Sequence, residues 1–559
     1  MARVVPVVAA VVLAAAVFAT FVSASGDGPL AKAVKAGDLA AVRALVASGA
    51  DVNARSGDGS TPLLWAAHGS DDDSARALIA AGARVDEAND YGITPLLQAS
   101  RAGDAAMVDL LLQAGADPAR AHPDGSTPVM AAARAGSVPA VRLLLVEGAD
   151  VHAADVFQHA TALMWASAEG HLEVVDLLLE AGADPNRQAH VNPLTERHNA
   201  DFPTGGFTAL MWAARNGDEA IVRRLVAGGA DMRLKNGDGA SATMIAIYND
   251  RFDLAATLVD LGSDANDGSL YMAVEMRDAT TDQFAFDGSR LRPDHPNERT
   301  ALDLIRLLLE RGADPNTPFA GQLHSTSMPN TDRFDNTPFF RAAIAADAEA
   351  LKLLAAHGAD LEQTPAVAAP GEGGSTDEPA GRGRGNPNAG RTAAMVTMGG
   401  GRGPGMTGGP AYIRSGPAPY REPGSRKAED AFAALVAAGA NPNAKAPDGA
   451  TLLHQAARAG NLEMVRALAA AGVDFNQPDA NGLTALDVAE GKRPAEAPAG
   501  ARAGRRGGPP PGGRGGRGTS QQDVAKLLRE LMGLPPAPVP DTPAADPADS
   551  ASAGGGAEP

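Results

Sequence analysis

Apolar and polar positions recur along this chain in one repeated block. Residues 160–186 give its clearest copy, which reads A-T-A-L-M-W-A-S-A-E-G-H-L-E-V-V-D-L-L-L-E-A-G-A-D-P-N. The block contains two apolar stretches with helical spacing, and the second is an aliphatic run from Val174 to Leu179. A Gly and polar residues follow each stretch. The pattern therefore predicts a helix, a turn, a second helix and a polar connection.

The first helix of each block has a recognisable start. Three blocks begin with Thr-Pro, at Thr61, Thr94 and Thr127, and two begin with Thr-Ala, at Thr161 and Thr208. Thr can cap a helix, and Pro loses no needed hydrogen bond at the first helical position. An aliphatic residue stands two places after the Thr, and Ala usually stands five or six places after it. These positions share one helical face, which we expect to be the packed face.

The blocks repeat with a nearly fixed period. The Gly that closes each second helix precedes Ala-Asp or a close variant, and five of the first six intervals and the last are 33 or 34 residues long. These glycines are Gly49, Gly82, Gly115, Gly148, Gly182, Gly229, Gly262, Gly312, Gly358, Gly439 and Gly472. A period of this length indicates a stacked repeat array.

The block resembles the ankyrin repeat, in which two helices are followed by an extended finger. The resemblance implies an all-α solenoid of about 12 units, from about Pro29 to Gly533 apart from loops. Asp-Gly pairs such as Asp58-Gly59 and Asp124-Gly125 would turn each finger into the next helix. The family's T-P-L-H motif corresponds to Thr451 to His454, and its G-H turn to Gly170 and His171, so both histidines are expected to be structural.

Three longer intervals contain insertions at loop positions only. Residues 187–205 and 317–335 fall in fingers, and residues 278–297 fall between the two helices of one unit. Insertions that leave every helix intact are compatible with a stacked array.

Composition divides the rest of the chain. We expect ankyrin repeats at 29–362 and 428–490, separated by a Gly/Pro/Arg-rich stretch at 363–427 that contains one degenerate repeat start at Thr392. An Arg/Gly/Pro-rich loop is expected at 491–518, a terminal helix at 519–533, with Gln521 to Met532 as its core, and a tail at 534–559. Such compositions bury too little apolar surface to fold, so the loops and the tail are predicted to be disordered.

The first residues predict export. Arg3 is followed by an uncharged apolar run from Val4 to Phe21 and by the small residues of Val22-Ser23-Ala24, which suits a signal peptide at 1–24 and a periplasmic or secreted protein. The alternative is an uncleaved N-terminal membrane anchor. The chain has no Cys, which excludes a lipoprotein anchor, disulfides and Cys-based catalysis.

Varied positions on the constant scaffold are the candidates for recognition. Four places after the starting Thr the residue varies, and the three tryptophans of the chain, Trp65, Trp165 and Trp212, all stand there. The resemblance places them near the concave surface as possible anchors, and the alternative is that each covers the neighbouring unit. The finger tips also vary, and they include Asn89, Tyr91, His122, Phe157, His159, Lys235 and Asn236. Trp65, Trp165, Trp212, Tyr91, Phe157 and His159 are the predicted partner-binding residues.

Signals for catalysis are weak, so no catalytic residue, cofactor or metal site is predicted. Insertion residues that could meet a metal show no ligand spacing; they are His190, His198, Asp201, Asp287, Asp294 and His295. Arginines among Gly and Pro suggest a nucleic-acid tail; they are Arg382, Arg384, Arg502, Arg505, Arg506, Arg514 and Arg517. The net charge of −19 opposes that interpretation. We therefore predict a monomeric, non-enzymatic scaffold that binds a protein, with an enzyme or metal-binding protein and an Arg-Gly nucleic-acid binder as alternatives.

Overall fold

The computed structural model describes residues 27–191, 205–237, 239–278, 297–319, 337–365, 390–398, 425–492 and 517–536. Within these ranges the chain forms helices, turns and extended connections. These ranges contain no β-strand, and Ala154 and Thr161 form one isolated antiparallel bridge. The described residues contain twelve helix pairs. The prediction of an all-α helix-turn-helix array is confirmed.

The chain divides into two compact units between Arg341 and Ala342. The helix pairs of the first unit are α2 (Pro29–Lys35) and α3 (Leu39–Ala47), α4 (Pro62–His68) and α5 (Asp72–Ala80), α6 (Pro95–Ala102) and α7 (Ala105–Gln113), α8 (Pro128–Arg134) and α9 (Val138–Val146), α10 (Ala162–Ala168) and α11 (Leu172–Glu180), α12 (Ala209–Asn216) and α13 (Glu219–Ala227), α14 (Ala242–Tyr248) and α15 (Phe252–Asp260), and α16 (Ser269–Asp278) and α17 (Ala301–Glu310).

The boundary falls inside α18 (Pro338–Ile344), which pairs with α19 (Ala348–Ala356). The remaining pairs, in the second unit, are α20 (Ala393–Val396) and α21 (Ala428–Ala437), α22 (Leu452–Ala459) and α23 (Leu462–Ala470), and α24 (Ala485–Ala489) and α25 (Arg517–Leu531).

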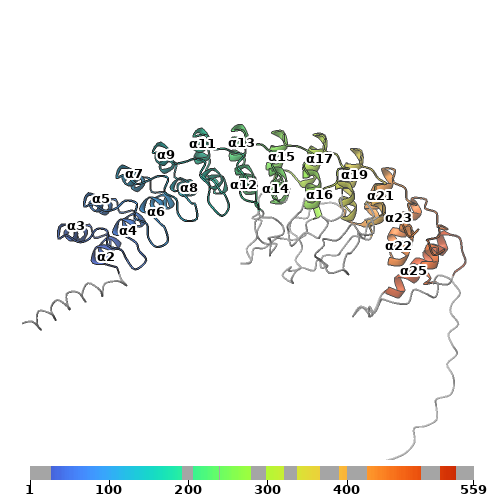
Figure 1. Ribbon diagram of the computed structural model, residues 1–559. Coiled ribbons are helices and arrows are strands. Elements are labelled where there is room, and N and C mark those ends of the chain that lie inside the picture. Colours follow the sequence, from blue (N-terminus) through green and yellow to red (C-terminus); the bar gives the residue numbers. More distant parts are fainter. Residues whose placement is uncertain are drawn as a thin grey trace, which may run out of the picture. The chain divides into compact units, whose positions relative to one another are not determined.

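The first unit consists of two layers of helices. First helices pack on first helices, from α2 through α16, and second helices pack on second helices, from α3 through α17. Within this unit the second-helix layer lies on the outer side of a curve and the first-helix layer on the inner side, from which the fingers project (Figure 1). Each repeat therefore buries its apolar face against its neighbours, as a solenoid requires.

Local sequence explains where the helices begin and end. The Thr61 hydroxyl accepts a hydrogen bond from the Leu64 N–H at 3.2 Å, and Pro62 takes the first helical position. Asp38 caps the second helix of its repeat in the same way, through the Ala41 N–H. The Gly after each second helix has a positive φ, for example 88° at Gly182, which residues other than Gly rarely adopt.

The core consists of small and aliphatic side chains at the predicted positions. Ala166 and Ala213 on first helices and Val175 and Leu178 on second helices are fully buried. Because Ala lets neighbouring helices approach closely, thin repeats can fill their interior with few aromatic residues. The packed face predicted from the repeats agrees with this burial.

Asn side chains that follow the second helices form hydrogen bonds to the next repeat. Asn53 accepts a hydrogen bond from the Arg84 N–H at 2.8 Å and donates one to the Gly82 carbonyl. Asn186 makes the same two bonds with the repeat that follows it: it accepts from the Asp231 N–H and donates to the Gly229 carbonyl. Residues 187–205 intervene in the sequence between these partners. The insertion therefore leaves the contact between these two repeats unchanged.

The degenerate repeat begins where the sequence predicts, whereas the last helix begins earlier than predicted. A short α20 begins after Thr392 and contacts α21, as expected for one split unit. Helix α25 begins at Arg517, four residues before the predicted Gln521 and inside the segment predicted to be a loop. Apolar periodicity marks only the turns that pack on other helices, so it misses a polar first turn. The other domain boundaries stay predictions.

Most of the low-complexity segments, the first 24 residues and nearly all of the tail lie outside the described residues. No helix in the described ranges is long and apolar enough to cross a membrane.

Candidate protein-interaction surface

The fingers are tight turns closed by backbone hydrogen bonds. In the first finger the Ser56 N–H donates to the Ser60 carbonyl at 2.8 Å, and the Asn89 N–H donates to the Ile93 carbonyl at 3.1 Å in the second. A Gly with positive φ completes each of these turns, Gly59 at 77° and Gly92 at 80°. The fingers therefore have a defined backbone on which side chains can be displayed.

Neighbouring fingers are joined by single backbone hydrogen bonds. The donor and acceptor pairs are Asp90 N–H to Asp58 at 3.1 Å, Val156 N–H to Asp124 at 2.8 Å, His190 N–H to Gln158 at 2.7 Å and Gly237 N–H to Gly205 at 2.9 Å. The third finger has Pro123 at this place, and Pro has no N–H to donate. A Cβ added to Gly92 would lie 2.4 Å from the Pro123 ring, so these two fingers meet by close packing.

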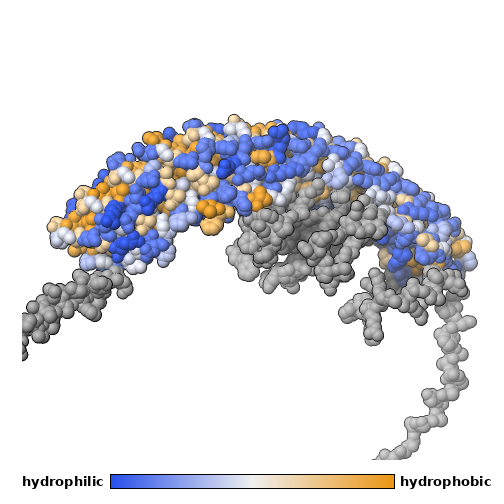
Figure 2. Space-filling model, in the orientation of Figure 1, coloured by the Kyte–Doolittle hydropathy of each residue, from blue (hydrophilic) through white to orange (hydrophobic). Residues whose placement is uncertain are grey.

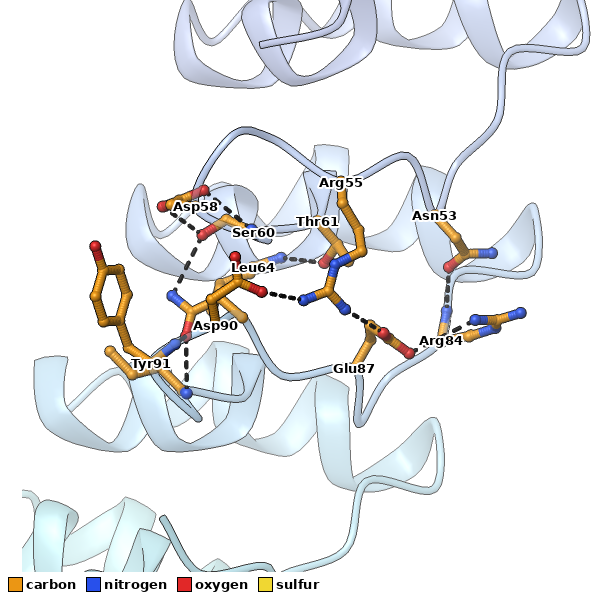
Figure 3. A network of polar contacts seen from close by, with 12 residues as sticks. Asn53, Arg55, Asp58, Ser60, Thr61, Leu64, Arg84, Glu87, Asp90 and Tyr91 are labelled. Atoms are coloured by element: carbon orange, nitrogen blue, oxygen red, sulfur yellow. Dashed lines mark hydrogen bonds and ion pairs between the residues drawn. The ribbon is translucent and has the colours of Figure 1, made fainter. Parts of the chain in front are cut away.

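An arginine clamp fixes the second finger against the first (Figure 3). The Arg55 guanidinium binds the Glu87 carboxylate at 2.6 Å and the Asp90 carboxylate at 2.8 Å. The Asn89 amide donates to the Ser60 hydroxyl at 3.3 Å. The Tyr91 ring points away from this network, so the clamp holds its backbone and leaves its side chain exposed.

Hydrogen bonds inside the turns also lower the pKa values of two carboxyl groups. Burial raises the pKa of Asp58, but the N–H and hydroxyl of Ser60 outweigh it, so that the pKa lies below its ordinary value. The pKa of Asp124 is lowered in the same way, since hydrogen bonds from Ser126 and His122 outweigh burial. Both side chains are turn builders, which is a structural role.

Two finger tips display large aromatic side chains. Tyr91 is 67% exposed and Phe157 is 75% exposed. Val156 and Val191, on the same finger as Phe157 and on the next one, are exposed as well. The face seen in Figure 2 mixes hydrophilic and hydrophobic residues. Among the described residues, Tyr91 and Phe157 are the aromatic members of the strongly exposed large apolar side chains. Exposed apolar patches on loops of a rigid scaffold are typical of binding surfaces.

The finger that carries Phe157 is one residue longer than the three fingers that precede it. Its closing hydrogen bond runs from the Asp155 N–H to the Ala160 carbonyl, a separation of five residues where the three preceding fingers have four. The extra residue accounts for the interval of 34 between Gly148 and Gly182. His159 occupies the left-handed position, with φ of 53°, that Gly occupies in the other fingers described above.

Other predicted tip residues build their turns. The Asn89 side-chain oxygen Oδ1 accepts from the Ile93 N–H at 3.0 Å, and the Asn236 Oδ1 accepts from the Ala240 N–H at 2.9 Å. His122 pairs with Asp124 at 2.7 Å, and the Lys235 ammonium donates to the Asp267 carbonyl at 3.1 Å. A position at which the residue type varies between repeats can therefore hold a residue that stabilises its turn. Variation alone did not identify the residues available for recognition.

Each tryptophan is half-buried, and a cation covers one face of its ring. The Lys35 ammonium lies 3.5 Å from the centre of the Trp65 ring, and the Arg134 guanidinium lies 4.5 Å from the centre of the Trp165 ring. Both cations come from the preceding repeat. Trp212 instead has Arg215 of its own helix at 5.4 Å, because Ala168 replaces the cation of the preceding repeat.

The position of the cation over Trp65 and over Trp165 follows a spacing that the sequence analysis missed. The cation stands seven places after the helix-capping residue of one repeat and contacts the residue four places after the cap in the next repeat. His68 and Gln98 occupy the same two positions, and the His68 Nδ1 and Gln98 Nε2 atoms lie 3.2 Å apart. Such pairs can be found in the sequence by comparing the residue seven places after one cap with the residue four places after the next cap.

Arg341 and His454 on first helices, and His171 at the N-cap of α11, have structural roles. Arg341, at the tryptophan position of its repeat, forms a buried ion pair with Glu275 of α16, in which the Nη2 and Oε1 atoms lie 3.0 Å apart. His454 is buried, contacts Thr451 within its own helix start and lies 2.9 Å from the Leu483 carbonyl oxygen of the next repeat. His171 lies 3.1 Å from the Arg134 carbonyl oxygen.

The described residues contain no group of three or more His, Asp or Glu side chains that could hold a metal ion. Of the insertion residues considered for metal binding, only His190 lies in the described ranges; the others lie outside them, as do the Arg-Gly arginines except Arg517. The three tryptophans, the two aromatic tips and His159 remain the candidate surface residues, and their role in partner binding stays a prediction.

Comparison with known proteins agrees with the architecture. The family model described as ankyrin repeats (3 copies) matches residues 30–122, 117–189 and 190–269, and the model described as ankyrin repeats (many copies) matches residues 435–489. No curated protein matches the sequence.

Two solved structures illustrate the likeness. The human ASB11 ankyrin repeat domain is 28% identical and is matched over 39% of this chain and 92% of its own length, with a TM-score of 0.34. The ankyrin repeat domain of Bcl-3, a unique member of the IkappaB protein family, is 30% identical over 40% of this chain and 95% of its own, also with a TM-score of 0.34. The family models together match more than half of the chain, and the chain belongs to the ankyrin repeat family.

Proposed function

We propose that this protein is an interaction scaffold that binds a partner protein through its finger tips. Ankyrin repeats generally mediate protein–protein interaction. The observation that carries the proposal is the exposure of Tyr91 and Phe157, 67% and 75%, on fingers whose backbones are fixed by hydrogen bonds. Rigid aromatic side chains lose little conformational entropy on binding, and they dominate binding hot spots.

The two tips define a two-point contact. Tyr91 stands on the second finger and Phe157 on the fourth, with the Pro123 finger between them. Packed helices are separated by 8–10 Å, so two repeats correspond to about 20 Å. A partner that engages both tips therefore needs two apolar pockets about that far apart, and the intervening finger offers backbone and polar contacts.

The tryptophans have a different part in this proposal. One face of each ring is already covered by a cation, and part of each side chain is buried between repeats. The three tryptophans lie on first helices, beside the fingers, and each side chain keeps part of its surface exposed. We therefore assign the main anchoring role to the tips and a supporting role to Trp65, Trp165 and Trp212.

Site-specific photo-crosslinking tests this proposal. A photoreactive phenylalanine analogue is placed at Tyr91, at Phe157 and, as a matched control, at Val146, which is 77% exposed at the end of α9. We expect one protein to be crosslinked in cells from both tip positions and not from the control. Crosslinking from Val146 alone, or equally from all three positions, would contradict the proposal.

We further propose that the protein is exported, on the strength of the N-terminal sequence alone. Cleavage after Ala24 would give a mature chain that begins at Ser25. Intact-mass measurement of protein from the envelope or medium tests this, and a mass that retains residues 1–24 in the membrane fraction favours the anchor.

A further inference from the structure

We propose that His159 and His190 form a binding site for a divalent transition metal ion between two adjacent fingers. The proposal does not depend on partner binding. It rests on the spacing of the two imidazole rings, on the hydrogen bonds that hold their backbones, and on the unusual backbone conformation of His159.

The ring spacing suits a shared metal ion. The ring centroids lie 5.4 Å apart, and the ring planes are inclined by 62°. Two imidazoles on one tetrahedral ion, with metal–nitrogen bonds of about 2.0–2.1 Å, have ring centres roughly 5 Å apart. The two side chains therefore need little movement to bind one ion together.

Backbone hydrogen bonds fix the two histidines relative to each other. The His190 N–H donates to the Gln158 carbonyl at 2.7 Å, directly beside His159, and the His190 carbonyl accepts from the Gly206 N–H at 2.9 Å. Part of the entropic cost of bringing two ligands together is therefore met by folding.

The conformation of His159 is an independent observation. It takes the left-handed conformation, with φ of 53°, at the turn position where Gly59, Gly92 and Gly125 stand in the three preceding fingers. A residue with a Cβ is disfavoured there relative to the right-handed region. Such outliers occur preferentially at functional sites, and here the outlier supplies one of the two imidazoles.

The expected ligand follows from the donors. Imidazole binds Zn²⁺, Ni²⁺ and Cu²⁺, and Cu²⁺ most tightly among divalent first-row ions. Both histidines are exposed, and no third His, Asp or Glu completes a metal-binding group in the described ranges. Water would fill the other coordination positions, so the site differs from a closed structural zinc site.

The experiment uses the full chain with Cu²⁺ alone as the probe. Electron paramagnetic resonance at one equivalent of Cu²⁺ reports the number of coordinated imidazole nitrogens, and calorimetry with Zn²⁺ reports the stoichiometry. The test variants are His159→Gly, which restores the residue of the other fingers, and His190→Gln. The control is His152→Gln, which changes an exposed histidine in the same repeat. Melting curves show that the variants are folded.

We expect two imidazole nitrogens in the parent and in His152→Gln, one in each test variant, and the loss of one bound Zn²⁺ per chain in both test variants. Unchanged spectra in the two test variants would overturn the proposal. A further variant, His198→Gln, tests binding by the insertion. Loss of the site in His198→Gln, with the site retained in His159→Gly, would also overturn the proposal, because the ion would then be bound by the insertion.

Discussion

A cation from one repeat covers the tryptophan of the next at Trp65 and Trp165. The two residues of each pair are about thirty positions apart, so the contact depends on how the repeats stack. Arg134 also pairs with Glu169 at 3.2 Å and therefore links two first helices twice. At the residue scale the tryptophans are elements of repeat stacking as well as candidates for recognition.

The pairing of Arg134 with Trp165 predicts a measurable coupling. In a double-mutant cycle of Arg134→Ala and Trp165→Gln, the coupling free energy should be about 0.5–1 kcal/mol, as expected for an exposed cation over an indole ring. Urea unfolding of the four proteins measures it. The matched cycle of Arg101→Ala with Trp165→Gln should give no coupling, because the repeat after Arg101 carries Ala131 at the tryptophan position. Equal coupling in both cycles would contradict the assignment.

The capping box of α24 predicts a pH-dependent contribution to stability. Burial raises the pKa of Asp487, but hydrogen bonds from Lys492 and Thr484 outweigh it and lower the pKa from 3.8 to about 2. Because the folded-state pKa is depressed, the stabilisation is present above the ordinary value and is lost as the pH falls toward the folded-state value. Asp487→Asn should therefore be less stable than the parent at pH 7.

The difference in free energy of unfolding between parent and Asp487→Asn should shrink between about pH 4 and pH 2. Urea midpoints at a series of pH values measure it. A difference that stays constant down to the lowest pH at which both proteins fold would show that the ionised carboxylate is not its source.

Among the elements, the turns between helices depend on glycine for two separate reasons. Gly125 has φ of 84°, and a Cβ there would lie 2.8 Å from the Val156 backbone nitrogen. Gly115 has φ of 89° and nothing within 4 Å of the same position. Both glycines satisfy a left-handed turn, but only Gly125 also allows the next finger to approach.

Gly125→Ala should therefore destabilise the protein more than Gly115→Ala. Both variants lose about 1–2 kcal/mol from the left-handed backbone, and Gly125→Ala loses a further 1–3 kcal/mol or so from overpacking. Thermal melts of the two variants give the comparison. Equal losses would mean that the fingers are not in close contact.

The helices predict a similar contrast between buried and exposed side chains. Leu178 is fully buried in α11, and Val146 is 77% exposed at the end of α9. Leu178→Ala should lower the free energy of unfolding by about 2–5 kcal/mol, because it leaves a cavity between repeats. Val146→Ala should change it by less than about 0.5 kcal/mol. Similar losses in the two variants, by urea unfolding, would show that the packed face is wrongly assigned.

Over the whole molecule, the repeat period and the Thr and Gly signals were enough to predict the helix pairs. Stacked repeats use the same helix-to-helix packing along the array, so the internal comparison substitutes for long-range information. The site was harder to predict. The exposure of Phe157 could be anticipated from the extra residue in its finger, but the meeting of His159 with His190 depends on the register between two fingers. The cation that covers Trp165 depends on stacking in the same way.

The central claim is that a partner protein binds at the finger tips, and direct titration of the crosslinked partner tests it best. Tyr91→Ser and Phe157→Ser should melt like the parent, because both side chains are exposed. Each should lose about 2 kcal/mol of binding free energy, roughly thirtyfold in affinity, whereas Val146→Ser should bind like the parent. Parental affinity in both tip variants, with binding lost in a folded Trp165→Gln, would contradict the claim and place the site on the first helices.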